Sequence, residues 1–283
     1  MTEDNKSYKR ELHRVEQQEL NYLKRRSKEK TSLLNAVTKK KIPEKMHDTL
    51  EEVFYRSLKM MLEKGTNGLE ATLGREKKEA RWEENIQHAQ ILRDSDSLRN
   101  LSREAAKDGA RSLILSGMTG VGLGIIGVGI PDVAVYSAML IREVYSHALN
   151  YGYHYDSDEE KYFVLLVIRG AFLSGPSLEE VNKKANVFMK KGEIPENTDL
   201  LNEIKVTAKT VAGELTSCKF VQGIPLVGVV GGAYDAVYMA RLAEFADIKY
   251  RKRMLDDYGP SLNAEKYNPV HVIRTEKAPE EKN

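Results

Sequence analysis

Two carboxylates stand in apolar surroundings and are the side chains best placed to do chemistry. Asp132 follows Pro131 at the end of an uncharged, glycine-rich stretch, and Asp235 lies inside a second apolar stretch. A carboxylate in a low-dielectric site is often catalytic or binds an ion. The alternative for Asp132 is the first turn of a helix, where the helix dipole stabilises an anion, and for Asp235 an ion pair with Arg142 or Arg241. Both aspartates are weak catalytic candidates, and we assign no catalytic residue.

The other reactive side chains lack the spacing that their chemistry requires. His147, His154 and Asp156 follow Glu143 but match no standard zinc pattern, so we expect exposed polar positions there. Cys218 is the only cysteine, which excludes an intramolecular disulfide and a cysteine-based zinc site and favours a reducing compartment. Three serines lack the G-x-S-x-G setting of a hydrolase nucleophile: Ser116, Ser174 and Ser217. We expect no metal and no cofactor, and an enzyme is the less favoured class.

Small residues organise both apolar stretches. Each contains the string I-P-x-V-small-V, at 130–135 and 224–229. Glycine inside a helix costs about 1 kcal/mol relative to alanine, so several on one face require a close backbone contact in return. The spacing therefore predicts two helical hairpins that bend at Pro131 and Pro225 and pack on each other or on a shared partner. The glycines of these faces are Gly117, Gly120, Gly124 and Gly127 in the first stretch and Gly228 and Gly232 in the second.

Helical periodicity runs through the rest of the chain, and no alternating strand pattern occurs. Capping boxes at Ser157 and Ser177 predict two helix starts, the second after a break over 170–176. The fold class is therefore all-α, a multi-helix bundle with two glycine-rich hydrophobic helical hairpins around I-P turns. We divide the chain into a basic N-terminal helix (1–41), an all-α domain (42–258) and a polar C-terminal tail that we expect to be disordered (259–283). The remaining helices are predicted from Ile42-Pro43 to Gly65, around Trp82, after Pro131, up to Gly192, over 199–217 and over 226–255.

Charge is concentrated at the N-terminus. The 283 residues carry a net charge of +2, yet residues 1–45 hold 13 Lys/Arg against 7 Asp/Glu. A basic end on a near-neutral protein suits an anionic membrane surface or a nucleic acid, and a solvated charged helix is the favoured alternative. The helix beginning near Tyr8 has only a thin apolar stripe and needs a packing partner. The first residues contain no apolar core of a secretory signal, so we expect an intracellular protein.

Membrane insertion of the first stretch is marginal. Residues 112–131 are uncharged and long enough to span, but their apolar side chains contribute only roughly −3 to −6 kcal/mol, and a deep Asp132 would cost about 2.5–3.5 kcal/mol. The second stretch, 220–234, is too short to span. A hairpin that dips into one leaflet and a buried hairpin in a soluble core fit equally well.

The order of these motifs resembles the EcsC family. The resemblance rests on G-I-P-D followed by a helix that ends in A-L-N-Y-G, and on I-P-x-V-G-x-x-x-G-A ending in Y-R-x-R-M-L. It extends to K-I-P-E-K-M-H at 41–47 and spans about residues 8–258. The family commonly has its aspartate before the proline, whereas here Asp132 follows Pro131. The resemblance implies a bacterial, membrane-associated protein linked to an ABC transporter, and it supplies no catalytic residues.

Three functions follow from this sequence. The first is a non-enzymatic accessory protein on the inner face of the cell membrane that docks through glycine hairpins and basic helices. Its partners would be membrane lipid and an integral membrane transporter, and not nucleic acid. The second is a membrane-surface enzyme acting on lipid through Asp132 or Asp235. The third is a soluble helical regulatory domain.

Overall fold

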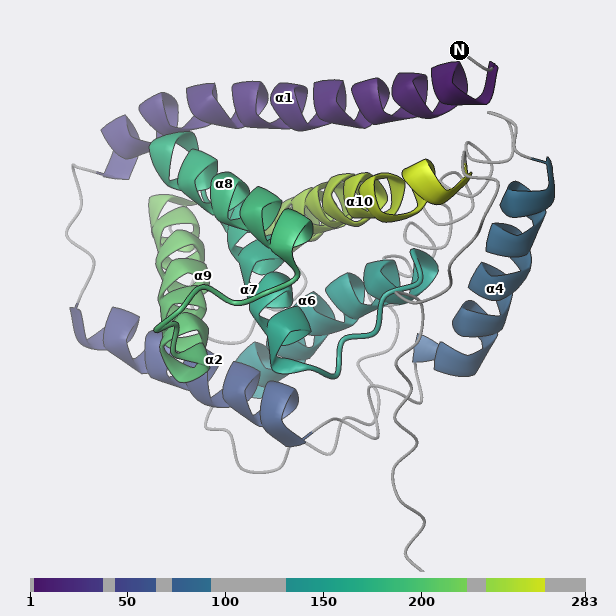
Figure 1. Cartoon of the computed structure of the whole chain (residues 1–283). Coiled ribbons are helices and arrows are strands. Elements are labelled where there is room, and N and C mark those ends of the chain that lie inside the picture. Colours follow the sequence, from purple (N-terminus) through teal and green to yellow (C-terminus); the bar gives the residue numbers. More distant parts are fainter. Residues whose placement is uncertain (1–2, 38–43, 65–72, 93–130, 223–232, 263–283) are drawn as a thin grey trace, which may run out of the picture.

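The computed structural model describes residues 3–37, 44–64, 73–92, 131–222 and 233–262 (Figure 1). Over these residues the chain forms helices and no strand, which confirms the all-α class. The helices are α1 (Glu3–Val37), α2 (Glu44–Lys64), α4 (Arg75–Leu92), α6 (Pro131–Asn150), α7 (Asp158–Phe172), α8 (Gly175–Lys191), α9 (Leu200–Gln222) and α10 (Ala233–Leu262).

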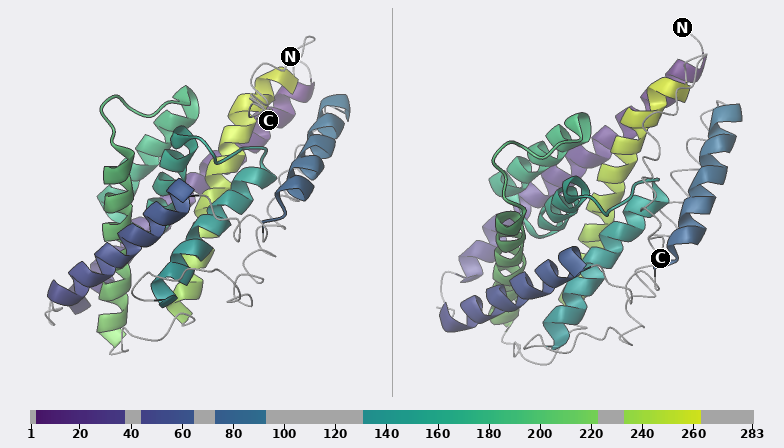
Figure 2. Two further views of the ribbon diagram at one scale, coloured as in Figure 1. Left: turned by 90° about the horizontal axis from the view of Figure 1, so that it is seen from below. Right: turned by 60° about the horizontal axis from the view of Figure 1, so that its bottom comes forward.

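Helix α7 forms the centre of the bundle. Every residue from Tyr162 to Phe172 is buried, and α6, α8, α9 and α10 pack around it (Figures 1 and 2). Aromatic rings join these helices, since Phe163 stacks on Phe188 of α8 and meets Tyr250 of α10 edge-on. Such aromatic pairs add to the stability gained from apolar burial alone. The core therefore lies where the sequence is most continuously apolar outside the glycine-rich stretches.

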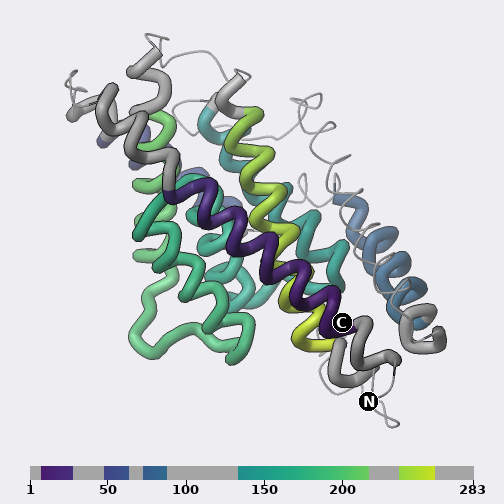
Figure 3. The backbone as a smooth tube through the Cα atoms, turned by 90° about the horizontal axis from the view of Figure 1, so that it is seen from above, coloured from purple at the N-terminus to yellow at the C-terminus, as the bar shows by residue number. Residues whose placement is uncertain are grey.

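Helix α1 lies across one side of the bundle, against α8 and α10 (Figure 3). Its predicted apolar stripe meets this surface, with Val15 and Tyr22 buried and Tyr8 and Leu12 partly buried. The partner that the stripe requires is thus supplied by the chain itself. Helix α2 packs on α9 and α6, and α4 stands at the edge of the bundle beside α6.

Several predicted helix ends are confirmed. Ser157 caps α7, because its hydroxyl accepts a hydrogen bond from the Glu160 backbone N–H. Gly192 ends α8 in the left-handed conformation, at φ 68°, which glycine adopts without steric cost. Helix α6 begins at Pro131, as the proline predicts.

The break expected over 170–176 is wrong in extent. Gly170 lies inside α7, and a Cβ atom there would come within 2.1 Å of the Phe245 ring. This glycine thus permits a close helix contact and does not end the helix. Helix α8 begins at Gly175, before the proposed capping box at Ser177, and its N-cap Ser174 makes no side-chain capping bond.

The predicted end of α10 also needs correction. The helix continues through Gly259 and Pro260 to Leu262, past the end predicted near residue 255. Within α10, Tyr238, Leu242 and Phe245 are buried, whereas Val237 is 42% exposed. Among the described helices none combines the length and the apolar character needed to cross a membrane.

Candidate functional site

The inner face of α1 fastens that helix to the end of α7. The Tyr22 hydroxyl donates to the Gly170 carbonyl oxygen at 3.1 Å, and the Arg26 guanidinium donates to the Leu173 carbonyl oxygen at 2.7 Å. These carbonyls close α7, where the helix dipole is negative and favours a cation. Arg26 belongs to the basic K-R-R-S-K-E-K run, yet it is buried. Part of the basic cluster therefore has a packing role.

A buried charge cluster joins α1, α8 and α10. Lys249, with a fully buried side chain, donates to Glu19 Oε1 at 2.5 Å and to Asn186 Oδ1 at 2.7 Å. Lys252 donates to Glu19 Oε2 at 2.5 Å, and the Asn186 amide donates to Glu19 Oε1 at 2.9 Å. Every oxygen of the carboxylate has a donor. The charge is thus both paired and hydrogen-bonded, which burial requires.

Opposing effects set the ionisation of this cluster. Burial alone would raise the pKa of Glu19, but the ammonium groups of Lys249 and Lys252 outweigh it and lower the pKa to about 2. Burial also lowers the pKa of Lys249 to about 8, because one shared carboxylate offsets only part of its desolvation. Both groups are therefore charged at neutral pH.

The outer face of α1 is basic. Among its described side chains, 8–27, the exposed charged ones are all lysine or arginine: Lys9, Arg10, Arg14, Lys24 and Arg25. The acidic residues turn inward, since Glu11 and Glu19 are buried and Glu16 is half-buried. Arg14 pairs with Glu11 and Arg25 with Glu244. Folding thus separates the charges of a mixed sequence and leaves a positive surface.

The polar face of α6 is buried, which corrects the expectation of an exposed position at His147, whereas Asp156 is exposed as expected. Glu143, Ser146, His147 and Asn150 are at most 9% exposed. Lys78 of α4 donates to the Ser146 hydroxyl and to Asn150 Oδ1, each at 2.8 Å. This contact anchors α4 on α6.

Glu143 and His147 form a close pair within α6. His147 Nδ1 lies 3.0 Å from the Glu143 backbone carbonyl oxygen, which can only accept, so this nitrogen carries the proton. The same nitrogen lies 3.5 Å from Glu143 Oε1. Neither carboxylate oxygen makes a hydrogen bond to any residue that the structure describes. Burial raises the pKa of Glu143, and the nearby charges of His147, Arg142 and Lys78 offset only part of that effect.

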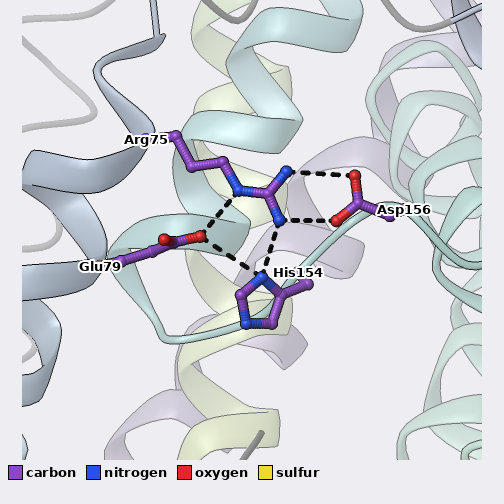
Figure 4. Close-up of polar contacts among 4 residues, drawn as sticks. All are labelled: Arg75, Glu79, His154 and Asp156. Atoms are coloured by element: carbon purple, nitrogen blue, oxygen red, sulfur yellow. Dashed lines mark hydrogen bonds and ion pairs between the residues drawn. The ribbon is translucent and has the colours of Figure 1, made fainter. Parts of the chain in front are cut away.

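His154 and Asp156 belong to a different contact, between α4 and the loop that precedes α7 (Figure 4). Arg75 donates to both Asp156 oxygens, at 3.1 and 2.7 Å, and to Glu79 at 2.8 Å. Its guanidinium also lies 3.0 Å from His154 Nδ1 and 5.1 Å from the centre of the Tyr155 ring. The Arg75 guanidinium lies between Glu79, His154 and Asp156, and these contacts fasten α4 to the loop.

The structure does not bring the proposed histidine and carboxylate ligands into one set. Within the described ranges, no group of three or more His, Cys, Asp or Glu side chains is arranged to hold a metal. Asp132 and Asp235 lie in the first turns of α6 and α10, and their side chains fall outside the described part. The residues proposed to form the hairpins lie outside the described ranges altogether: Gly117, Gly120, Gly124, Gly127, Pro225, Gly228 and Gly232. The hairpins therefore stay a prediction.

Sequence reasoning missed the cluster around Lys249. The signal was available, because Lys249 falls between Ile248 and Tyr250 on a helix whose other positions near it pack inward. Periodicity alone treats such a lysine as solvated. Only the partners on α1 and α8, distant in sequence, show why it is buried.

Fold and site together define an all-helical protein. Buried ion pairs hold its N-terminal helix on the bundle, and the outer face of that helix exposes basic side chains to solvent. The chain belongs to the EcsC protein family, whose family model matches residues 6–255. That range includes most of α1. No curated protein and no solved structure gives a significant match.

Proposed function

We propose that this protein is a non-enzymatic accessory protein that docks on the anionic inner surface of the cell membrane. The observation that carries the proposal is the charge separation on α1. Lys9, Arg10 and Lys24 are exposed, whereas Glu11 and Glu19 are held against the bundle. Each basic residue near an anionic bilayer contributes about 1 kcal/mol of attraction.

The buried cluster supports this docking mode. Because Glu19 is held by Lys249 and Lys252, it cannot turn outward and repel anionic headgroups. The helix is also fixed at Tyr22 and Arg26 to the end of α7. A rigid helix loses little conformational entropy when it binds a surface. An integral membrane transporter, as the family resemblance implies, is the proposed protein partner at that surface.

Vesicle sedimentation tests the proposal. We expect the protein to bind vesicles of phosphatidylglycerol and phosphatidylcholine, to bind pure phosphatidylcholine weakly, and to be released at high salt. The triple variant Lys9→Gln, Arg10→Gln and Lys24→Gln should bind at least tenfold more weakly.

A matched control removes three exposed lysines from other helices. Lys77, Lys205 and Lys209 lie on α4 and α9, and changing all three to glutamine alters the net charge equally. Equal loss in both triple variants would mean that net charge alone acts. Unchanged binding of the α1 variant would contradict the proposal.

A further inference from the structure

We infer that the docking surface spans two helices, α1 and the C-terminal half of α8, and that its partner is a bilayer rich in anionic phospholipid. This inference rests on the proposed function and deepens it. Residues 183–191 of α8 contain no acidic residue. Their exposed side chains are four lysines and a valine, namely Lys183, Lys184, Val187, Lys190 and Lys191.

The packing of α8 leaves these lysines outward for a physical reason. Ala185, Phe188 and Met189 are buried against the bundle, so the helical repeat turns the lysines to the opposite side. Lys184 pairs with Glu180 at 2.9 Å. Lys183, Lys190 and Lys191 make no ion pair in the described part of the chain.

The two basic helices are joined at their contact. Asn186 of α8 donates to Glu19 of α1 at 2.9 Å, and Lys249 bridges the same two residues. Seen from the α1 side of the bundle, α8 emerges from beneath α1 (Figure 3). Because the two helices contact each other, their exposed basic residues can approach one surface together.

Exposed apolar side chains at this junction distinguish a bilayer from other polyanions. Leu20 follows Glu19 directly and is 57% exposed, and Val187 follows Asn186 and is 47% exposed. These are the two most exposed of the large hydrophobic side chains in the described residues. Apolar residues among bases are typical of elements that lie in the headgroup layer, whereas a phosphate backbone in water offers leucine no partner.

Two triple variants separate the inference from the function on which it rests. Lys183→Gln, Lys190→Gln and Lys191→Gln should weaken binding to vesicles containing phosphatidylglycerol at least tenfold, as the α1 triple does. The control triple at Lys77, Lys205 and Lys209 should bind within twofold of wild type. Loss in the α1 variant alone would overturn the two-helix surface and leave the proposed function standing, and loss in neither would overturn both.

Environment-sensitive fluorophores provide a second measurement that does not depend on charge. Single cysteines are placed by Leu20→Cys, Val187→Cys or, as a control on α9, Val206→Cys, each in a Cys218→Ser background. On anionic vesicles we expect a blue shift of the emission at positions 20 and 187 and none at 206. No shift at 187, or binding to a DNA oligonucleotide but not to vesicles, would overturn the inference.

Discussion

The Lys249 ammonium lies 2.5 Å from the Glu19 carboxylate, although 230 residues separate them, and the lysine side chain is fully buried. The pair connects α1 to α10, and Asn186 adds α8. Desolvation of two charges is costly, and it is offset only because each oxygen of Glu19 has a donor. The cluster of Glu19, Asn186 and Lys249 therefore specifies the position of α1 on the bundle and adds little net stability.

Removing one partner of this pair should be strongly destabilising. In Glu19→Gln the Lys249 charge stays buried without its counter-ion, so we expect a loss of about 3–5 kcal/mol in the free energy of unfolding. Urea denaturation followed by circular dichroism measures it. The control Glu52→Gln removes an exposed carboxylate that pairs with Arg56 and should change stability by less than about 1 kcal/mol. Equal losses of stability in Glu19→Gln and Glu52→Gln would show that Glu19 is not the buried partner of Lys249.

The same pair predicts acid sensitivity. The pKa of Glu19 is about 2 in the folded protein and 4.5 in its reference state, so the unfolded chain binds more protons between these values. Its stabilising contribution is complete above pH 4.5 and is lost as pH falls from 4.5 to about 2. Urea midpoints measured across this range should fall more steeply for wild type than for Glu19→Gln. Parallel slopes would contradict the assignment.

Gly152 leaves room for Trp82 of α4 to pack against the backbone. Its φ is +79°, and a Cβ atom there would lie 2.2 Å from the Trp82 ring. Gly152→Ala should therefore lose about 1–3 kcal/mol from crowding in addition to backbone strain, and should change the fluorescence of Trp82, the only tryptophan. Gly74→Ala is the matched control, because Gly74 has a φ of +61° and no described atom lies within 4 Å of a Cβ added there. If both variants behave alike, Trp82 does not pack there.

The folded protein should be more stable when the side chain at position 143 is neutral. The folded pKa of Glu143 is raised by burial, so the folded state binds the extra proton and stability falls as pH rises above 4.5. Glu143→Gln removes this penalty, and at pH 7 it should be more stable than wild type by about 1 kcal/mol or more. Thermal unfolding between pH 5 and 8 tests this. A less stable variant at pH 7 would indicate that the charged form is required.

The glycine face of the first apolar stretch stays a prediction that mutagenesis can test. If Gly120 and Gly124 allow close helix contact, replacing both by leucine should cost about 1–3 kcal/mol per site, while alanine should cost less. Thermal unfolding of the two double variants distinguishes them. An unchanged melting temperature for the leucine variant would show that these glycines do not face a packed neighbour.

The sequence by itself determined the helices and most of their inner faces. Val15 and Tyr22, like Phe54 and Leu58, recur at the helical period, so apolar burial follows from local order. The capping hydroxyl of Ser157 and the left-handed Gly192 are likewise local signals, read within one turn of the chain. They required no knowledge of distant contacts.

Only the tertiary structure decided which polar residues are buried. The sequence pattern predicts solvent exposure for four polar residues that are buried in the structure: Glu19, Arg26, Glu143 and His147. Their burial depends on contacts with partners that periodicity does not reveal. Glu19 needs Lys249, and Arg26 needs the carbonyls at the end of α7. The basic outer face of α1 has the same origin: the bundle draws the acidic residues of α1 inward, whereas the exposed lysines and arginines stay in water, which solvates their charges.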